Sequence, residues 1–203
     1  MRYLVPSLLV VVAYLAGSFP TGILLARARG VDLRKVGSGN IGATNVGRAL
    51  GRSWGVLVLL VDAAKGFLPV LLARQLGQGP WVLAAVGLAA LLGHSFSVFL
   101  GGKGGKSVAT ALGAALAIAP LPALGCLVIY AILLAALRIS SIGSISGVLA
   151  FPLLVWLLGP RVPAFYAFGF AAAALVIVRH IDNLKRLARG EELKATSGSG
   201  SAS

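Results

Sequence analysis

The sequence predicts an all-α integral membrane protein, a seven-transmembrane-helix bundle with the N-terminus outside and the C-terminus cytoplasmic. Three observations support this class. Hydrophobic residues make up 58% of the 203 residues and charged residues only 11%, with a mean hydropathy of +0.95, whereas a soluble domain has about 25% charged residues. The apolar residues gather in seven stretches, and the cations fall mainly on one side of the implied bilayer.

Seven stretches can be assigned to the membrane, because a spanning helix needs roughly 20 apolar residues to cross a hydrocarbon core about 30 Å thick. The first is too long for the apolar region of a signal peptide, so we interpret it as a retained span. The fourth and sixth are short, and we expect them to tilt little, thin the bilayer or pack as partial spans. In order, the predicted spans are Leu4–Ala26, Ser53–Ala73, Trp81–Leu100, Val108–Ala119, Leu121–Leu137, Ile145–Leu158 and Ala164–Val178.

Orientation follows from the cations, since loops that stay in the cytoplasm carry an excess of Lys and Arg. Only Arg2, Arg74 and Arg161 fall on the other side, and Lys65 lies within a span. With the N-terminus outside and the C-terminus in the cytoplasm, the number of spans must be odd. The net charge of +13 is explained by this topology and by attraction to anionic lipid, without nucleic acid. The cytoplasmic cations are Arg27, Arg29, Arg34, Lys35, Arg48, Arg52, Lys103, Lys106, Arg138, Arg179, Lys185, Arg186, Arg189 and Lys194.

Little chain remains outside the spans, so we predict one transmembrane domain over residues 1–196 and a flexible Ser/Gly tail over 197–203. Three polar segments interrupt the apolar sequence, all on the predicted cytoplasmic side. They are Gly37–Asn45 (GSGNIGATN), Gly101–Ser107 (GGKGGKS) and His180–Arg186 (HIDNLKR). Any chemistry must occur there, and their convergence on one face favours an enzyme.

The second segment predicts an anion site. Backbone N–H groups in glycine-rich turns form concave sets of donors, so Gly104 and Gly105 beside Lys103 and Lys106 are candidates to bind a phosphate. A nucleotide-binding P-loop is excluded, because that motif needs glycine where this chain has Leu100. A flexible turn with two lysines that set the topology is the alternative.

The first segment has more hydrogen-bonding groups than a connection requires. Ser38 and Arg48 are the main functional candidates, because an arginine fork can bind phosphate through two hydrogen bonds. The other three polar residues of the segment would support the loop. They are Asn40, Thr44 and Asn45.

Two histidines lie near the cytoplasmic ends of predicted helices. His94 is either a catalytic residue or a hydrogen-bonded core residue. His180 and Asn183 are three residues apart and therefore share a helix face, where they either complete the site or cap the helix at the interface.

Asp62 and Lys65 lie deep in the second span, where a charge costs roughly 2.5 to 3.5 kcal/mol, so we predict a structural ion pair. A proton or ion pathway is the alternative.

Cys126 is expected in the core. No His, Cys, Asp or Glu cluster has the spacing of metal ligands, so neither a metal nor another cofactor is predicted.

Together, SGNIGATN (Ser38–Asn45), GGKGGKSVAT (Gly101–Thr110) and H-x-x-N-L-K-R followed by Glu192 resemble the three signature regions of the acyl-phosphate-dependent glycerol-3-phosphate acyltransferases, the PlsY family. The likeness extends over essentially the whole chain. One departure is Ser107, where this resemblance leads us to expect glycine. Another is Gly101 with Gly102, in place of bulkier residues.

The resemblance implies a multi-pass enzyme of the bacterial inner membrane whose active site faces the cytoplasm. It would transfer a fatty acyl group from acyl-phosphate to the 1-hydroxyl of sn-glycerol 3-phosphate. The products would be lysophosphatidic acid and phosphate, in the first step of phospholipid synthesis. Its partners would be the two substrates and membrane lipid, with no nucleic acid and no metal.

On this hypothesis Ser38, Arg48 and Lys106, supported by Lys103, bind substrate phosphate and the developing oxyanion. His180 and Asn183 complete the glycerol phosphate pocket, and Asn183 also counts among the catalytic candidates. His94 orients or deprotonates the acceptor hydroxyl, unless a substrate phosphate oxygen takes that proton. Glu192 is structural.

Two alternatives remain at this stage. A covalent mechanism through Ser38 is the second choice, because no base adjacent in the sequence marks it as an activated nucleophile. A transporter or flippase of an anionic metabolite is the alternative function, with Asp62 and Lys65 in its path.

Overall fold

The computed structural model describes residues 3–195, and every regular element in that part of the chain is helical. The predicted tail, 197–203, lies outside the described residues. The elements are α1 (Leu4–Ser18), α2 (Thr21–Arg27), η1 (Leu33–Lys35), α3 (Ala43–Leu50), α4 (Arg52–Gln75), α5 (Pro80–Ser95), η2 (Val98–Leu100), α6 (Val108–Ile118), α7 (Pro120–Leu137), α8 (Ser140–Leu158), α9 (Pro163–Arg179) and α10 (Ile181–Ala188).

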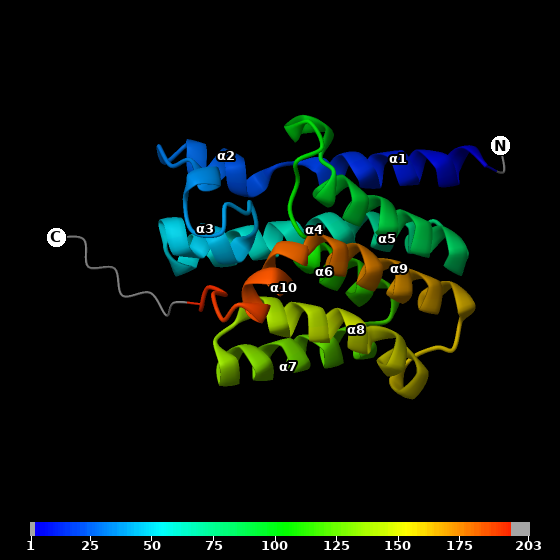
Figure 1. Cartoon of the computed structure of the whole chain (residues 1–203). Helices are drawn as coiled ribbons and strands as arrows, with labels where there is room; N and C mark the ends of the chain where they lie inside the picture. The colour runs from blue at the N-terminus through cyan, green and yellow to red at the C-terminus, as the bar shows by residue number, and fades with distance from the viewer. Residues whose placement is uncertain (1–2, 196–203) are drawn as a thin grey trace.

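The long helices α1 and α4 to α9 lie side by side along one axis, whereas α2, α3 and α10 gather at one end of the bundle (Figure 1). The first turn of α1 lies at the opposite end. The first and third polar segments lie at the end marked by α3 and α10, which we call the polar end, and the second reaches it through Lys106, which contacts Asn183. This arrangement brings together residues that are far apart in the sequence.

The all-helical membrane architecture is confirmed, but length and composition alone do not give seven spans. Five helical segments of the described chain are long and apolar enough to cross a membrane, and the pair α9 and α10, bent by 59°, would make a sixth. The predicted fourth span is the 11-residue helix α6, about 17 Å long at 1.5 Å per residue. It is short because the segment before it enters the bundle as an extended loop.

The first predicted span is a broken helix. Pro20 separates α1 from α2, since proline has no N–H to donate to the preceding turn. In a membrane the carbonyl groups at such a break need other partners. The Lys65 ammonium lies 2.6 Å from the carbonyl oxygen of Phe19 and donates to it. A residue of α4 thus supports the break in the first span.

Other boundaries also differ from the prediction. Helix α5 ends at Ser95, five residues before the predicted end, and α8 begins at Ser140, five residues before the predicted start. The first serines of α8 are compatible with a helix because the Ser144 hydroxyl donates to the Ser140 carbonyl at 2.8 Å. Helix α3 was not predicted, because its short polar sequence lacks the apolar run that identifies a span. His180 and Asn183 were expected on one helix face, but α9 ends at Arg179 and Asn183 lies on the separate helix α10.

Helix α6 is seated against α4 through two glycines. A Cβ atom at Gly66 would collide with the Thr110 carbonyl, and one at Gly113 would collide with the Ala63 carbonyl. Such close backbone contact is typical of small residues in membrane helix pairs. It fixes the start of α6, and with it the glycine-rich loop that precedes α6, inside the bundle.

Candidate active site

One cavity of about 200 Å³ joins the polar end to the apolar interior. The polar end is lined by candidate residues from all three polar segments. The interior part is lined by apolar residues of α4 and α6 to α9, among them Leu59, Leu112, Leu127, Val148 and Phe151. The candidates on the cavity wall are Ser38, Asn40, Thr44, Asn45, Arg48, Asp62, His94, Lys106, His180, Asn183 and Glu192.

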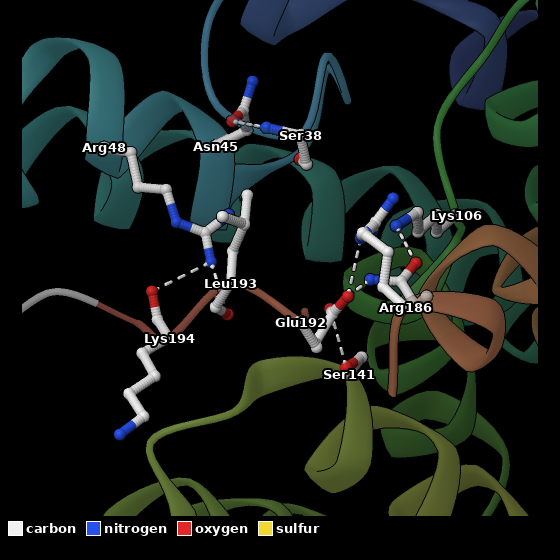
Figure 2. Close-up of polar contacts among 10 residues, drawn as sticks. Ser38, Asn45, Arg48, Lys106, Ser141, Arg186, Glu192, Leu193 and Lys194 are labelled. Carbon is white, nitrogen blue, oxygen red and sulfur yellow. Dashed lines mark hydrogen bonds and ion pairs between the residues drawn. The ribbon is translucent and has the colours of Figure 1, made fainter. Parts of the chain in front are cut away.

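Asn45 organises the first polar segment. Its side chain is 1% exposed, and its Oδ1 accepts the Ser38 N–H at 3.0 Å (Figure 2). Its Nδ2 donates to the carbonyls of Val36 at 3.0 Å and Asn40 at 2.9 Å, with a longer contact of 3.3 Å to Leu33. One buried amide therefore holds the loop that presents Ser38 to the cavity.

Arg48 points from α3 across the mouth of the cavity. Its guanidinium donates to the carbonyls of Leu193 at 3.2 Å and Lys194 at 3.3 Å (Figure 2). Burial is the main cause that lowers the pKa of Arg48 from its ordinary value, and the attraction of Glu192 opposes it. The chain that follows α10 thus occupies donors that a phosphate could also use.

Lys106, Asn183 and Glu192 form a network at the centre of the polar end (Figure 2). The Lys106 ammonium donates to the Asn183 side-chain oxygen. The Asn183 amide donates to Glu192 at 2.5 Å, and the same carboxylate accepts from Ser141 at 2.9 Å and Arg186 at 2.8 Å. Glu192 therefore anchors the last described segment to α8 and α10.

Two pKa values at this network are shifted. Burial, followed by the nearby charge of Arg186, lowers the pKa of Lys106 to about 8. Burial alone would raise the pKa of Glu192, but hydrogen bonds from Asn183, Ser141 and Arg186 outweigh it and lower the pKa. Lys106 is thus a cation near neutral pH that loses its proton more readily than an ordinary lysine.

The glycine-rich loop before α6 is held on both edges. The N–H groups of Gly104 and Gly105 donate to the carbonyls of Ser95 at 3.1 Å and His94 at 2.9 Å. On the other edge, Arg179 donates to the carbonyls of Gly104 and Gly105, both at 3.0 Å. This differs from the prediction that the two glycines bind phosphate, because their N–H groups already have partners. A Cβ atom at Gly105 would collide with the His94 ring.

Ser107, the departure from the expected glycine, adopts a left-handed backbone conformation with φ of 58°, which is unusual for a residue other than glycine. Its hydroxyl donates to the Leu91 carbonyl at 2.7 Å and lies 2.6 Å from the Ser95 hydroxyl oxygen. Because these buried contacts require a hydroxyl, they offset part of the conformational cost.

His94 lies on the cavity wall next to a buried ion pair. Its Nδ1 is 4.0 Å from an Asp62 carboxylate oxygen, which is 2.5 Å from the Lys65 ammonium. All three side chains are at least 92% buried. The ring of His94 therefore contacts Asp62 on one side and the glycine-rich loop on the other. His180, between α9 and α10, reaches the cavity, and its Nδ1 lies 2.8 Å from the Val176 carbonyl oxygen.

Lys103 is the candidate cation that does not reach the cavity. Its side chain is exposed, while its carbonyl accepts from Arg34. Two contributors were missed, Ser141 on α8 and Arg179, which had been counted only toward the topology. The serines at 140, 141 and 144, next to an apolar stretch, were a usable signal, whereas the role of Arg179 depends on contacts with residues more than 70 positions away.

The fold and the site define a class, a multi-pass membrane protein in which one cavity joins a basic hydrogen-bonding mouth to an apolar interior. The chain belongs to the glycerol-3-phosphate acyltransferase family, whose model matches residues 7–190. The resemblance found in the three polar segments is thereby confirmed.

Curated relatives match over nearly their whole length. The chain is 53% identical over 186 residues to the glycerol-3-phosphate acyltransferase of Geobacter sulfurreducens, covering 91% of this chain and 95% of that protein. It is 52% identical over 198 residues to the enzyme of the same name from Anaeromyxobacter dehalogenans, covering 94% and 98%.

Solved structures agree in fold. The crystal structure of PlsY (YgiH), an integral membrane glycerol 3-phosphate acyltransferase, in its glycerol 3-phosphate form superimposes with a TM-score of 0.91 at 42% identity, covering 95% of this chain and 96% of that one. The lysophosphatidic acid form of PlsY gives a TM-score of 0.87 at 41% identity, covering 94% and 95%.

Proposed function

We propose that this protein transfers a fatty acyl group from acyl-phosphate to the 1-hydroxyl of sn-glycerol 3-phosphate, releasing lysophosphatidic acid and phosphate. The observation that carries the proposal is the cavity with a basic mouth and an apolar interior. Both substrates combine a phosphate with the group that reacts, and one of them also carries a long acyl chain. The homologous PlsY, described in glycerol 3-phosphate and lysophosphatidic acid forms, supports glycerol 3-phosphate as the acceptor and lysophosphatidic acid as the product here.

The phosphate groups bind at the polar end. Arg48 and Lys106 supply positive charge, and Ser38, His180 and Asn183 supply hydrogen-bonding groups around it. Because the Arg48 donors contact only two backbone carbonyls at 3.2 and 3.3 Å, a phosphate dianion can displace these contacts and bind more strongly. Lys103 has no part in this arrangement.

The acyl chain lies in the apolar part of the cavity and enters from the bilayer. The acceptor hydroxyl attacks the acyl carbonyl carbon, the carbon to phosphate-oxygen bond breaks, and phosphate leaves with its electron pair. A phosphate oxygen of the substrates takes the proton of the hydroxyl. Positioning and charge neutralisation dominate, because phosphate in a mixed anhydride is a good leaving group.

His94 is assigned a positioning role in this mechanism. Its ring lies between Asp62 and Gly105, so it supports the loop that carries Lys106. Covalent transfer through Ser38 is not preferred, because the Ser38 N–H donates to Asn45, and this hydrogen bond orients the backbone without activating the hydroxyl. The proposed acyl transfer consumes no cofactor.

We further propose seven membrane crossings, with the short helix α6 as the fourth of them. The polar end then faces the cytoplasm of a bacterial inner membrane, as the distribution of cations predicts. In a Cys126→Ala background, an impermeant thiol reagent applied to intact cells should label Gly77→Cys, between α4 and α5, and not Arg189→Cys, after α10. The reverse pattern would overturn this orientation.

The reaction is tested with purified, detergent-solubilised protein, glycerol 3-phosphate and one donor at a time: palmitoyl-phosphate, palmitoyl-CoA or palmitoyl carrier protein. Lysophosphatidic acid is expected from palmitoyl-phosphate alone. Product from a thioester donor instead would refute acyl-phosphate as the donor, but it would still support acyl transfer to glycerol 3-phosphate. No product from any donor, together with phosphate ester uptake by reconstituted vesicles, would instead favour the transporter.

A further inference from the structure

The cavity ends at the same depth on several helices. On α8 its wall runs from Ser140 to Phe151, and along α9 it runs from His180, which directly follows the helix, to Phe168. At about 1.5 Å per helical residue, the two walls are about 17 Å and about 18 Å long. The polar mouth is at one end of both walls, and a phenylalanine is at the other end of each.

The two phenylalanines close the inner end together. Their ring centroids are 5.8 Å apart with an interplanar angle of 79°, an edge-to-face contact. Phe151 is 3% exposed and Phe168 is 1% exposed. A Cβ atom at Gly169 would lie 2.9 Å from the Phe151 ring, and one at Gly87 would lie 2.9 Å from the Phe168 ring. The rings are therefore packed directly against neighbouring backbone and have little room to move.

The bundle is closed one turn below this pair. Val155 on α8 is 0% exposed, Phe165 on α9 is 6% exposed, and Ile118 on α6 is 4% exposed. All three belong to the main hydrophobic core, and none of them lines the cavity. The apolar part of the cavity is thus a channel with a floor, made by Phe151 and Phe168.

We propose that the Phe151–Phe168 pair sets the longest acyl chain that this protein uses efficiently, a proposal that rests on the acyl transfer proposed above. A hydrocarbon core of about 30 Å holds two chain lengths, so one membrane chain measures about 15 Å, close to the length of the cavity wall from mouth to floor. A longer chain must force the rings apart, and such overpacking weakens binding about 5- to 150-fold. The preferred donors therefore carry chains of ordinary membrane length.

The test is a competition among donors of different length. Purified protein receives glycerol 3-phosphate and equal amounts of lauroyl-, palmitoyl- and arachidoyl-phosphate in one detergent, and mass spectrometry gives the ratios of the lysophosphatidic acid products. Because each ratio is internal to one sample, it does not depend on how much of a variant is folded. The variant is Phe151→Ala, with Phe151→Leu as a milder substitution if the alanine variant cannot be purified.

The matched control is Phe170→Ala, since Phe170 lies on α9, is 65% exposed and faces away from the channel. In Phe151→Ala the ratio of arachidoyl to palmitoyl product should rise about 10-fold or more through relief of overpacking, while Phe170→Ala should match the wild type. Ala172→Leu, one turn above the floor, should shift the ratios toward lauroyl product.

Equal ratios in Phe151→Ala and Phe170→Ala would overturn the proposal, since the chain would then leave sideways between helices without meeting the floor. Wild-type protein that makes no product from any of the three donors would overturn the proposed function, and this inference with it. Wild-type activity thus separates the two failures.

Discussion

The two glycine-containing loops at the polar end are held in opposite ways. The first, which includes Ser38, is organised by one nearby side chain, Asn45, within 12 residues of all its partners. The second, which includes Lys106, has backbone hydrogen bonds to the nearby Ser95 and His94, and it is also held by side chains from distant parts of the chain, Arg34 on one carbonyl and Arg179 on two. A local support can fail through one substitution, whereas a distributed support loses only part of its hydrogen bonds.

The largest effect is expected from a substitution that removes the positive charge of Lys106, the residue of the second loop that lines the cavity. Lys106→Met should lower kcat/KM for glycerol 3-phosphate about 1000-fold, because the site loses a cation in a partly buried environment. Initial rates of lysophosphatidic acid formation give the value. Lys103→Met is the control from the same loop and should stay within about two-fold, since its side chain is exposed. Similar losses of kcat/KM in both variants would contradict the finding that, of these two lysines, only Lys106 lines the cavity.

The next largest effect is expected from removal of the Asn45 side chain, which holds the first loop. Asn45→Ala leaves the Ser38 N–H and three carbonyls without this partner, which should displace Ser38 and Arg48. A displacement of about 1 Å can cost about 100-fold in kcat/KM. Ser53→Ala, at an exposed position of α4, is the control. If Asn45→Ala loses less activity than a variant at Arg179, the comparison between the loops is wrong.

Substitution of Arg179 should have a smaller effect, because the second loop keeps its bonds to α5 and Arg34. Arg179→Ala should lower kcat/KM about 10-fold, because it removes two hydrogen bonds worth about 0.7 kcal/mol each and about 1.4 kcal/mol is tenfold. Added guanidinium ion should restore part of the activity, whereas sodium should not. Lys185→Ala controls for lost charge. Unchanged activity in Arg179→Ala would show that the loop needs no support from α9.

The smallest effect is expected from pH alone. With the pKa of Lys106 at about 8, half of the molecules lack this cation at pH 8, so kcat/KM should fall to about half of its value near neutral pH and continue to fall above it. Stability should respond with the opposite sign. Between the folded pKa and the ordinary value of 10.5 the unfolded chain binds more protons, so this group makes folding more favourable as pH rises.

A pH profile of initial rates, compared with thermal unfolding of the same samples, measures both trends. If activity and stability both fall between about pH 8 and pH 10.5, the alkaline decline in activity is not caused by the loss of the Lys106 proton. The Lys106→Met variant should lack the alkaline decline, which identifies the group responsible.

Much of this site was accessible from sequence because the signals are local. Ser38, Arg48, Lys106, His180 and Asn183 were all chosen as polar or basic residues at the boundary of apolar stretches, and all five line the cavity. Lys103 was chosen for the same reasons and lies outside it. Composition cannot distinguish the two lysines, since only the path of the loop decides which side chain faces inward.

The fold shows the same division. The helical membrane class follows from the length of the apolar stretches and the placement of cations, because hydrocarbon thickness and loop charge act on each segment separately. The break at Pro20, by contrast, is completed by Lys65, a residue of another helix. The short α6 also reflects its neighbours, since the segment before it is held inside the bundle by α5 and α9.

By itself the sequence determined that this protein is a helical membrane protein with three polar segments gathered on one side, together with its family resemblance. Only the tertiary structure decided that these segments share a cavity, that Arg179 and Ser141 support it, and that Phe151 and Phe168 close it. The physical reason is distance along the chain: hydropathy and charge act segment by segment, whereas a cavity and its floor exist only where side chains from several helices meet.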